Sequence, residues 1–125
     1  MKTMNTDKAP AAIGPYSQAI ISGGLVFTSG QIPVDPATGV IAGETIVEQA
    51  KQVMANLQVV LAAAGTTPER TVKTTCFLAD MADFAAFNEI YAQTFTSKPA
   101  RSCVAVRTLP KGVLCEVEVI AEVED

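Results

Sequence analysis

The first third of the chain contains two short runs of β-favouring residues. These runs, 17–21 and 25–29, flank Ser22-Gly23-Gly24, and the arrangement predicts a β-hairpin. Between residues 31 and 44, Pro and Gly break every regular pattern of apolar positions. We therefore expect an ordered loop after the hairpin.

A helical period of apolar positions follows the loop. Thr45 and Glu48 have the spacing of a capping box, and apolar residues then recur at helical intervals as far as Ala64. Gly65 supplies a stop signal. The pattern predicts one long helix between Thr45 and Gly65.

The second half of the chain contains strand and helix signals in turn. Residues 71–78 are rich in Val, Thr and Phe and predict a strand, after which Asp80 is expected to cap a second helix. Residues 100–106 and 114–123 predict two more strands, which we expect to form a hairpin. The second helix carries an aromatic stripe that we interpret as core and not as a cofactor site: Phe84, Phe87, Tyr91 and Phe95.

The order β-β-α-β-α-β-β indicates the α+β class, with a mixed sheet and two helices on one face. No repeat, low-complexity tract or linker interrupts the chain, so residues 1–125 are expected to form a single domain. Two helices can cover only one face of the sheet. Because the strands are not polar enough for a solvated second face, we expect that face to be buried in a homo-oligomer.

Composition narrows the range of functions. Lys and Arg number 9 against 13 Asp and Glu, and the net charge of −4 without a basic cluster argues against nucleic acid as a partner. The absence of His excludes Ser-His and Cys-His nucleophile pairs and His-containing zinc sites. Neither an export signal nor a membrane span is indicated, so we expect a cytoplasmic protein without membrane contact.

The three cysteines are odd in number and show no Cys-x-x-Cys spacing. This usage fits reduced thiols in a reducing compartment better than a disulfide framework. We interpret Cys76 and Cys115 as small buried hydrophobic residues.

Candidate chemistry lies in the last two predicted strands. Strand alternation places Arg101 and Cys103 on one face of the first strand, and Glu116 and Glu118 on one face of the second. Counting back from the turn of the expected hairpin sets Arg101 opposite Glu118 and Cys103 opposite Glu116. Two interpretations stay open: a solvated Arg–Glu ion pair of little energetic weight, or an anion-binding arginine beside a carboxylate that orients water.

Two turns could add polar groups to such a site. In Gly14-Pro15-Tyr16 a turn projects an aromatic hydroxyl just before the first predicted strand. In Thr28-Ser29-Gly30 a strand ends in hydroxyls and in a glycine that permits close approach of other groups. Each motif alone is ordinary turn chemistry, and only the combination is informative.

The combination closely resembles a known family. The stretches that carry the resemblance are residues 12–19, residues 27–33, and Pro99-Ala100-Arg101-Ser102-Cys103-Val104 followed by Leu109-Pro110-Lys111 and Glu116. They resemble the reactive-intermediate deaminase (RidA, or YjgF-like) family over nearly the whole chain. The Arg-Ser-Cys-Val form of the last motif is similar to the enamine/imine deaminase subgroup.

The resemblance implies a chorismate-mutase-like α+β fold, assembled as a homotrimer with three clefts between subunits. It also implies hydrolysis of 2-imino acids, or of the 2-enamino acids that tautomerise to them, to ammonia and a 2-oxo acid. The substrates implied are 2-iminopropanoate and 2-iminobutanoate, released by pyridoxal-phosphate dehydratases acting on serine and threonine. No cofactor and no metal are expected.

The resemblance also assigns roles to individual residues. Arg101 would bind the substrate carboxylate through two parallel hydrogen bonds, and Glu116 would orient or activate the attacking water. Backbone groups at Cys103 and at the Ser29-Gly30 turn would fix the two ends of the substrate. Tyr16 would close the pocket and offer a hydroxyl hydrogen bond.

Asn88 is a weaker candidate for substrate binding, because on the aromatic helix it is expected mainly to bond backbone and support the wall of the pocket. The chain departs from the family pattern at two places. Cys115 stands where an aliphatic residue is usual, and the approach to Arg101, Thr96-Ser97-Lys98-Pro99, is shorter than in many members and lacks an aromatic residue. A shorter approach could widen the mouth of the cleft.

Three rival functions are weighed against deamination. The first is a trimeric binding protein for small carboxylates such as 2-oxo acids, which would use Arg101 without turnover. The second is the ribonuclease or translation-inhibitor role attached to some relatives, which the negative charge and the absence of His disfavour. The third is a redox-switched chaperone-like role, which the sequence leaves open.

Overall fold

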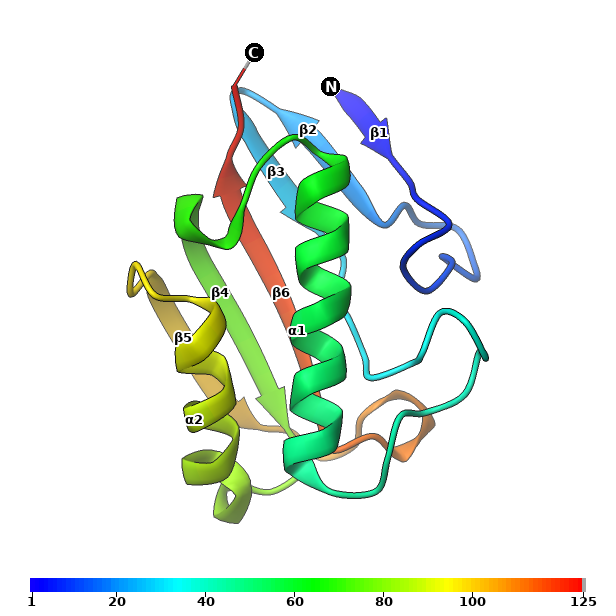
Figure 1. The fold of residues 1–125 in the computed structure, drawn as a ribbon, viewed down its shortest axis with the longest axis vertical. Coiled ribbons are helices and arrows are strands. Elements are labelled where there is room, and N and C mark those ends of the chain that lie inside the picture. Colours follow the sequence, from blue (N-terminus) through cyan, green and yellow to red (C-terminus); the bar gives the residue numbers. More distant parts are fainter. Residues whose placement is uncertain (125) are drawn as a thin grey trace.

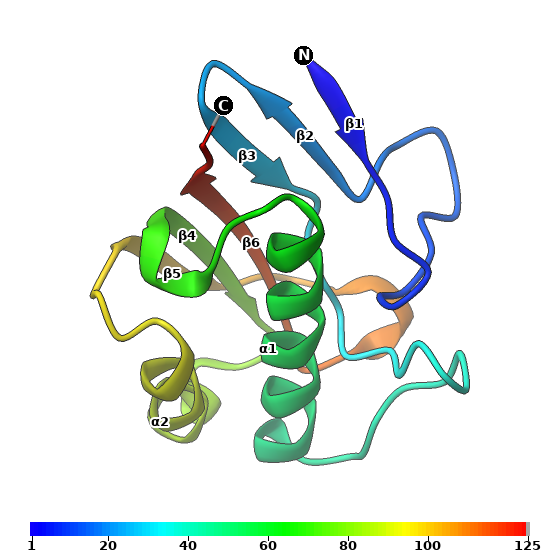
Figure 2. The same cartoon turned by 45° about the horizontal axis from the view of Figure 1, so that its top comes forward.

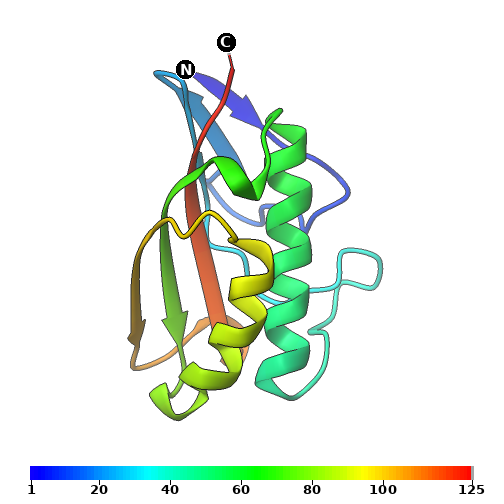
Figure 3. The same cartoon turned by 60° about the vertical axis from the view of Figure 1, so that its left-hand side comes forward.

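A six-stranded mixed sheet forms the centre of the structure, and both helices pack on one of its faces (Figure 1, Figure 3). The computed structural model describes residues 1–124. The elements are β1 (Lys2–Met4), β2 (Ala19–Ser22), β3 (Leu25–Thr28), α1 (Ile46–Ala63), β4 (Thr71–Leu78), α2 (Phe84–Thr94), β5 (Ala100–Ala105) and β6 (Cys115–Glu122). The expected α+β class and the placement of both helices on one face are confirmed.

The strand order in the sheet is β1-β2-β3-β6-β4-β5. All neighbours pair antiparallel except β4 and β5, which are parallel because α2 carries the chain back between them. The expected hairpin of the last two strands is therefore wrong, since β4 lies between β5 and β6. The connection over residues 106–114 can step past one strand, which requires only about 10 Å.

The first hairpin has the predicted turn. Ser22 pairs with Leu25, so that Gly23 and Gly24 form a two-residue turn with positive φ angles of 62° and 77°. Such angles favour glycine and match the right-handed twist of the two strands. The first strand of the chain, β1, was not predicted. Its three residues carry no apolar pattern of their own and are held by pairing with β2.

The long helix α1 begins as expected. Thr45 accepts a hydrogen bond from the Glu48 N–H, and the Glu48 side chain in turn accepts from the Thr45 N–H, which completes the capping box. The apolar face of α1 lies on the sheet, with Val53 and Leu57 fully buried. Asp80 caps a 3₁₀ turn over Met81–Asp83, which precedes α2, and not α2 itself.

Two buried amide side chains of α1 hold loops against the helix. The Asn56 side chain donates to the carbonyls of Ile32 and Val34 at 3.2 and 3.0 Å, and Gln49 accepts from the Leu114 N–H at 2.7 Å. The loop over residues 29–45, the connection before β6 and the segment that follows β1 gather near one end of the molecule (Figure 2). The helix thus positions the loops as well as filling the core.

The face of the sheet opposite the helices carries mixed side chains. Apolar groups stay exposed there, with Phe27 at 40% and Val104 at 47% exposure. Lys73 donates to Ser102 at 3.3 Å on the same face, next to Glu118. Neither helix covers this face (Figure 3).

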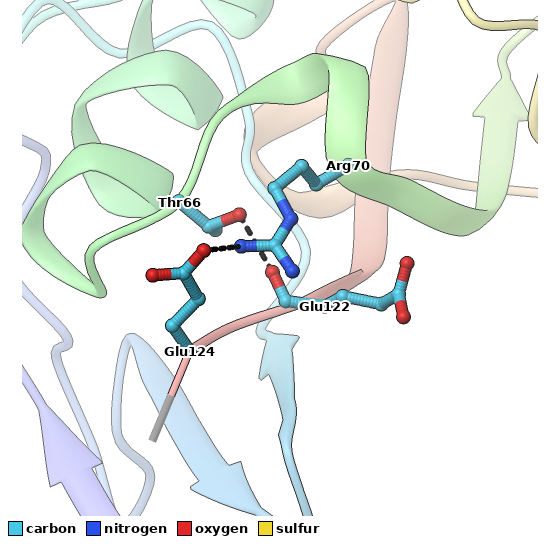
Figure 4. Close-up of polar contacts among 4 residues, drawn as sticks. All are labelled: Thr66, Arg70, Glu122 and Glu124. Carbon is cyan, nitrogen blue, oxygen red and sulfur yellow. Dashed lines mark hydrogen bonds and ion pairs between the residues drawn. The ribbon is translucent and has the colours of Figure 1, made fainter.

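Short contacts join the connection between α1 and β4 to the end of β6 near the C-terminus (Figure 4). Thr66 donates a 2.6 Å hydrogen bond to the Glu122 carbonyl, and Arg70 lies 3.5 Å from a Glu124 carboxylate oxygen. The ion pair is solvent-exposed and stabilises the fold by at most about 1 kcal/mol. Within residues 1–124, neither helix has the length and apolar character needed to cross a membrane.

Candidate active site

The Arg101 side chain lies on the helix-covered face of the sheet and packs against side chains of α2. Its Nη1 donates a 2.7 Å hydrogen bond to Oδ1 of Asn88. Its guanidinium carbon lies 4.7 Å from the centroid of the Tyr91 ring and 5.4 Å from that of Phe84. The aromatic stripe packs in or against the core as predicted, and two of its members, Phe84 and Tyr91, also flank the arginine.

These contacts hold the Arg101 guanidinium in one orientation and leave some of its N–H donors free. Thr74, which pairs with Arg101 across the strands, shares a 2.7 Å hydrogen bond with the Tyr91 hydroxyl. Asn88 engages one Arg101 donor only, so that further N–H groups remain for an anion. The expectation that Asn88 bonds backbone is wrong: its side chain positions Arg101.

A hollow of about 380 Å³ opens beside this arginine. Asn88, Tyr91 and Arg101 line it together with residues of the approach to β5, among them Lys98. The shorter approach noted in the sequence therefore forms one wall of the space in front of Arg101.

Glu116 points from β6 toward the open face of the sheet. Its strand neighbours Cys115 and Val117 are fully buried under the helices, so alternation directs Glu116 the other way. In the true register Glu116 pairs with Phe77 of β4, and Arg101 pairs with Thr74. The counting that set Arg101 opposite Glu118 and Cys103 opposite Glu116 is wrong, because β4 separates the two strands.

A bulge brings Gly30 against the Glu116 carboxylate. Phe27 pairs with Ile120, yet Gln31 bridges to Val117, so this segment advances four residues while β6 advances three. A Cβ at Gly30 would lie 2.8 Å from Cδ of Glu116 and would overlap its Oε2. Close approach of the carboxylate is therefore what requires glycine at this position.

Burial raises the pKa of Glu116, and the negative charge of Glu118 raises it further. Both causes disfavour the ionised form, since burial removes water and Glu118 adds a like charge on the same face. A carboxylate with a raised pKa is a better proton acceptor at neutral pH than an exposed one. Its position and its chemistry suit a group that orients and activates water.

Removing the charge of Glu118 should lower the pKa of Glu116. In Glu118→Gln we expect the acid limb of the pH profile of kcat/KM to move to lower pH, because Glu116 then ionises more easily. Glu122→Gln, on the same strand, is the matched control and should leave the limb in place. An acid limb that stays fixed in Glu118→Gln would mean that another group controls it.

The Ser29-Gly30 turn lies beside Glu116, and Tyr16 shares a cavity with Gly30. Tyr16, 53% exposed, lines a mainly apolar cavity of about 500 Å³ together with Gly30 and Ile32. The Ser29 hydroxyl donates to the Ser17 carbonyl at 2.6 Å, and the Ser29 N–H donates to Gln18 at 2.8 Å. Ser29 thus fixes the turn, while Tyr16 and Gly30 face the cavity.

Cys103 shares the helix-covered face with Arg101. In the register of β4 and β5 it lies opposite Cys76. Burial raises the pKa of the Cys103 thiol, against a smaller opposite effect of Arg101. Burial likewise raises the pKa of Cys76 and of Cys115 to about 12. All three cysteines are free, as expected, and their thiols are poor nucleophiles at neutral pH.

Cys103→Ser should therefore retain most of the activity, because the role carried over to this position needs only the backbone. We expect kcat/KM within about threefold of the wild type. The matched control is Cys76→Ser, which places a hydroxyl in the core and should lower the melting temperature more. A natively folded but inactive Cys103→Ser protein would instead assign a role to the thiol.

Metal ligation finds no support among the described residues. Within residues 1–124, His, Cys, Asp and Glu side chains form no group of three that could hold an ion.

Residues 6–123 match the family model described as Endoribonuclease L-PSP. The chain belongs to this family. The match confirms the resemblance to the RidA, or YjgF-like, proteins.

Individual members of the L-PSP family align with the chain over nearly its full length. A RutC family protein of Synechocystis is 56% identical over 124 residues, which cover 97% of this chain and 95% of the relative. A Salmonella typhimurium protein named 2-iminobutanoate/2-iminopropanoate deaminase is 50% identical over 124 residues, 96% of each chain. A crystal structure of a Rid family protein from Yersinia pestis has a TM-score of 0.95 and 48% identity, with 98% of each chain covered.

In this L-PSP family chain the predicted site residues fall into two groups. We call Arg101, Asn88 and Cys103 the arginine half-site, and Glu116, Tyr16, Ser29 and Gly30 the glutamate half-site. The charged residues of the two half-sites, Arg101 and Glu116, lie on opposite faces of one sheet. The sequence did not reveal Asn56 and Gln49 as positioning residues, although polar residues at apolar positions of a helix are a signal for such a role.

Proposed function

We propose that this chain is a deaminase that hydrolyses 2-imino acids such as 2-iminopropanoate and 2-iminobutanoate to 2-oxo acids and ammonia. The observation that supports this most directly is the pair of half-sites: an arginine with free donors, and a half-buried carboxylate with a raised pKa. The name of the Salmonella relative points to the same reaction. The enamino acids that tautomerise to these imines are covered by the same proposal.

The two half-sites are proposed to meet between subunits. Arg101 and Glu116 face opposite sides of the sheet, so one chain cannot direct both at one small substrate. In a cyclic homotrimer, one patch of each copy meets a different patch of the next, and the arginine half-site of one copy can face the glutamate half-site of its neighbour. Such an arrangement would also cover the exposed Phe27 and Val104 on the open face.

The reaction needs little beyond positioning. Arg101 binds the substrate carboxylate, and Glu116 accepts a proton from the water as its oxygen attacks the imine carbon. The carbon–nitrogen double bond becomes a single bond, and the nitrogen takes the proton that Glu116 removed from the water. Glu116 then accepts the hydroxyl proton and passes it to the nitrogen, so that the carbonyl forms as the carbon–nitrogen bond breaks, ammonia leaves, and Glu116 is again ionised.

Pyridoxal-phosphate dehydratases acting on serine and threonine are the proposed source of these imines. A freely diffusing imine would not require contact between the two proteins. The proposal therefore includes a homotrimer and a small substrate, but no cofactor, no nucleic acid and no membrane. The family description names a ribonuclease, and nothing in the net charge of −4 or in either half-site favours RNA binding.

The test is a coupled assay. Threonine dehydratase generates 2-iminobutanoate, semicarbazide competes for it, and both the semicarbazone and released 2-oxobutanoate are measured. We expect the wild-type protein to suppress trapping and to speed release of 2-oxobutanoate. Suppressed trapping at stoichiometric protein without faster release would instead favour the small-carboxylate binding protein, and unchanged trapping at high protein concentration would refute the deaminase.

A further inference from the structure

Lys98 adopts a left-handed backbone conformation, with φ at 56°. Glycine or asparagine is the usual occupant of such a position, because a longer side chain raises the conformational energy. The turn is anchored by Phe95, which is 2% exposed and accepts a 3.3 Å hydrogen bond from the Lys98 N–H. The backbone is thus held in a conformation that lysine disfavours, and such outliers point to a role for the side chain.

Lys98 is one of the residues that line the hollow in front of Arg101. This space, about 380 Å³, lies between α2 and the start of β5, and its lining includes no Asp or Glu from residues 1–124. Across the described chain, neither Lys98 nor Arg101 forms an ion pair. Two cationic residues therefore line one hollow that has no acidic residue in its lining, in a chain whose net charge is −4.

We propose that Lys98 is a specificity residue that binds a second anionic group of the substrate, so that this chain deaminates dicarboxylic 2-imino acids of four or five carbons. The inference rests on the proposed function, with the first carboxylate bound to Arg101. Three residues of chain span at most about 10 Å, so the long side chains of Lys98 and Arg101 can converge on one small molecule. The ammonium group is a point charge on a flexible stem, so it suits the second carboxylate of either a four-carbon or a five-carbon imino acid.

The chemistry at the imine carbon is unchanged by the second carboxylate. One water adds, one ammonia leaves, and the product is a 2-oxo dicarboxylic acid. Such imines arise when an amino dicarboxylic acid is oxidised at its α-carbon. That class of oxidation would supply the substrate.

The experiment compares two imines in the same semicarbazide assay. An amino-acid oxidase acting on glutamate, with catalase present, supplies 2-iminoglutarate, and threonine dehydratase supplies 2-iminobutanoate. In the wild type we expect kcat/KM for 2-iminoglutarate to equal or exceed that for 2-iminobutanoate. In Lys98→Met we expect the ratio of the two values to fall about tenfold, as for loss of one charge-assisted hydrogen bond.

Three further variants separate charge from conformation. Lys51→Met changes an exposed lysine on α1 and should leave the ratio at the wild-type value. Lys98→Arg should keep most of the ratio. Lys98→Gly should lose it while raising the melting temperature, because glycine relieves the left-handed backbone.

The outcomes distinguish the proposed role of Lys98 from the proposed deaminase function. Turnover of 2-iminobutanoate with no turnover of 2-iminoglutarate would overturn the role of Lys98 and leave the deaminase standing. An unchanged ratio in a folded Lys98→Met protein would do the same. Activity on neither imine would overturn the proposed function and this inference together.

Discussion

Arg101→Ala and Glu116→Gln should each abolish imine hydrolysis, and co-assembly of the two inactive variants should restore it. Loss of the bidentate arginine removes two charge-assisted hydrogen bonds to the carboxylate, so kcat/KM should fall by at least about a hundredfold. Loss of the Glu116 carboxylate removes the proton acceptor and should lower kcat by about 10²–10⁴. Neither change should unfold the chain, because both side chains are only half-buried.

Restoration follows from the placement of the half-sites on opposite faces of the sheet. If the site lies between subunits, a working cleft needs Glu116 from an Arg101→Ala chain and Arg101 from a Glu116→Gln chain. Random assembly of equal amounts then regenerates about one cleft in four overall, and about one in three within the trimers that contain both variants. The measurement is 2-oxobutanoate release by trimers co-expressed with two affinity tags and purified on both.

The double variant Arg101→Ala/Glu116→Gln, co-assembled with wild type, is the control. It can contribute no complete half-site pair and should only dilute activity. Purified mixed oligomers of the two single variants without activity would show that the two groups act within one chain, contrary to the proposal. A monomeric wild-type protein in solution would contradict it as well.

Gly30→Ala should lower kcat by about a hundredfold while leaving the fold intact. The added methyl group would occupy the space of the Glu116 carboxylate and displace it, and displacement of a catalytic group by about 1 Å can have an effect of that size. The clash involves the end of a flexible, half-buried side chain and no backbone, so the carboxylate can move aside. Kinetics with 2-iminobutanoate and thermal unfolding measure the two effects separately.

The control for this prediction is the double variant Gly30→Ala/Glu116→Ala. Truncation of the glutamate removes the clash, so the double variant should unfold at the same temperature as Glu116→Ala and have the same residual activity. Additive losses of activity in the double variant would show that Gly30 acts independently of Glu116. Full activity of Gly30→Ala would place the working carboxylate elsewhere.

Local sequence signals were sufficient to predict the elements that are stabilised by residues close together in the sequence. The capping box at Thr45 and Glu48, the apolar period of α1 and the Gly23-Gly24 turn are each contained within a few residues, and the structure has them as expected. The bounds of β4 were also predicted. Arg101 and Glu116 could likewise be chosen as candidate site residues from residue type and neighbouring motifs.

The partners of the strands could not be inferred in this way. The pattern of β5 and β6 is the same whether they pair with each other or on either side of β4, because strand alternation fixes the direction of a side chain but not the neighbour of its strand. The choice depends on the crossover through α2 and on burial of the whole sheet. For the same reason β1, with three residues, is visible only through its pairing with β2.

The sequence by itself therefore determined the longer helices and strands, the α+β class, the family and the candidate site residues. The tertiary structure alone decided where those residues face: Arg101 points toward α2, where it contacts Asn88 and Tyr91, and Glu116 points toward the open face. It also decided that a bulge brings Gly30 against the carboxylate. The physical reason is that helix periods, caps and tight turns are set by neighbours in sequence, whereas strand order and the direction of a sheet face are set by contacts between distant segments.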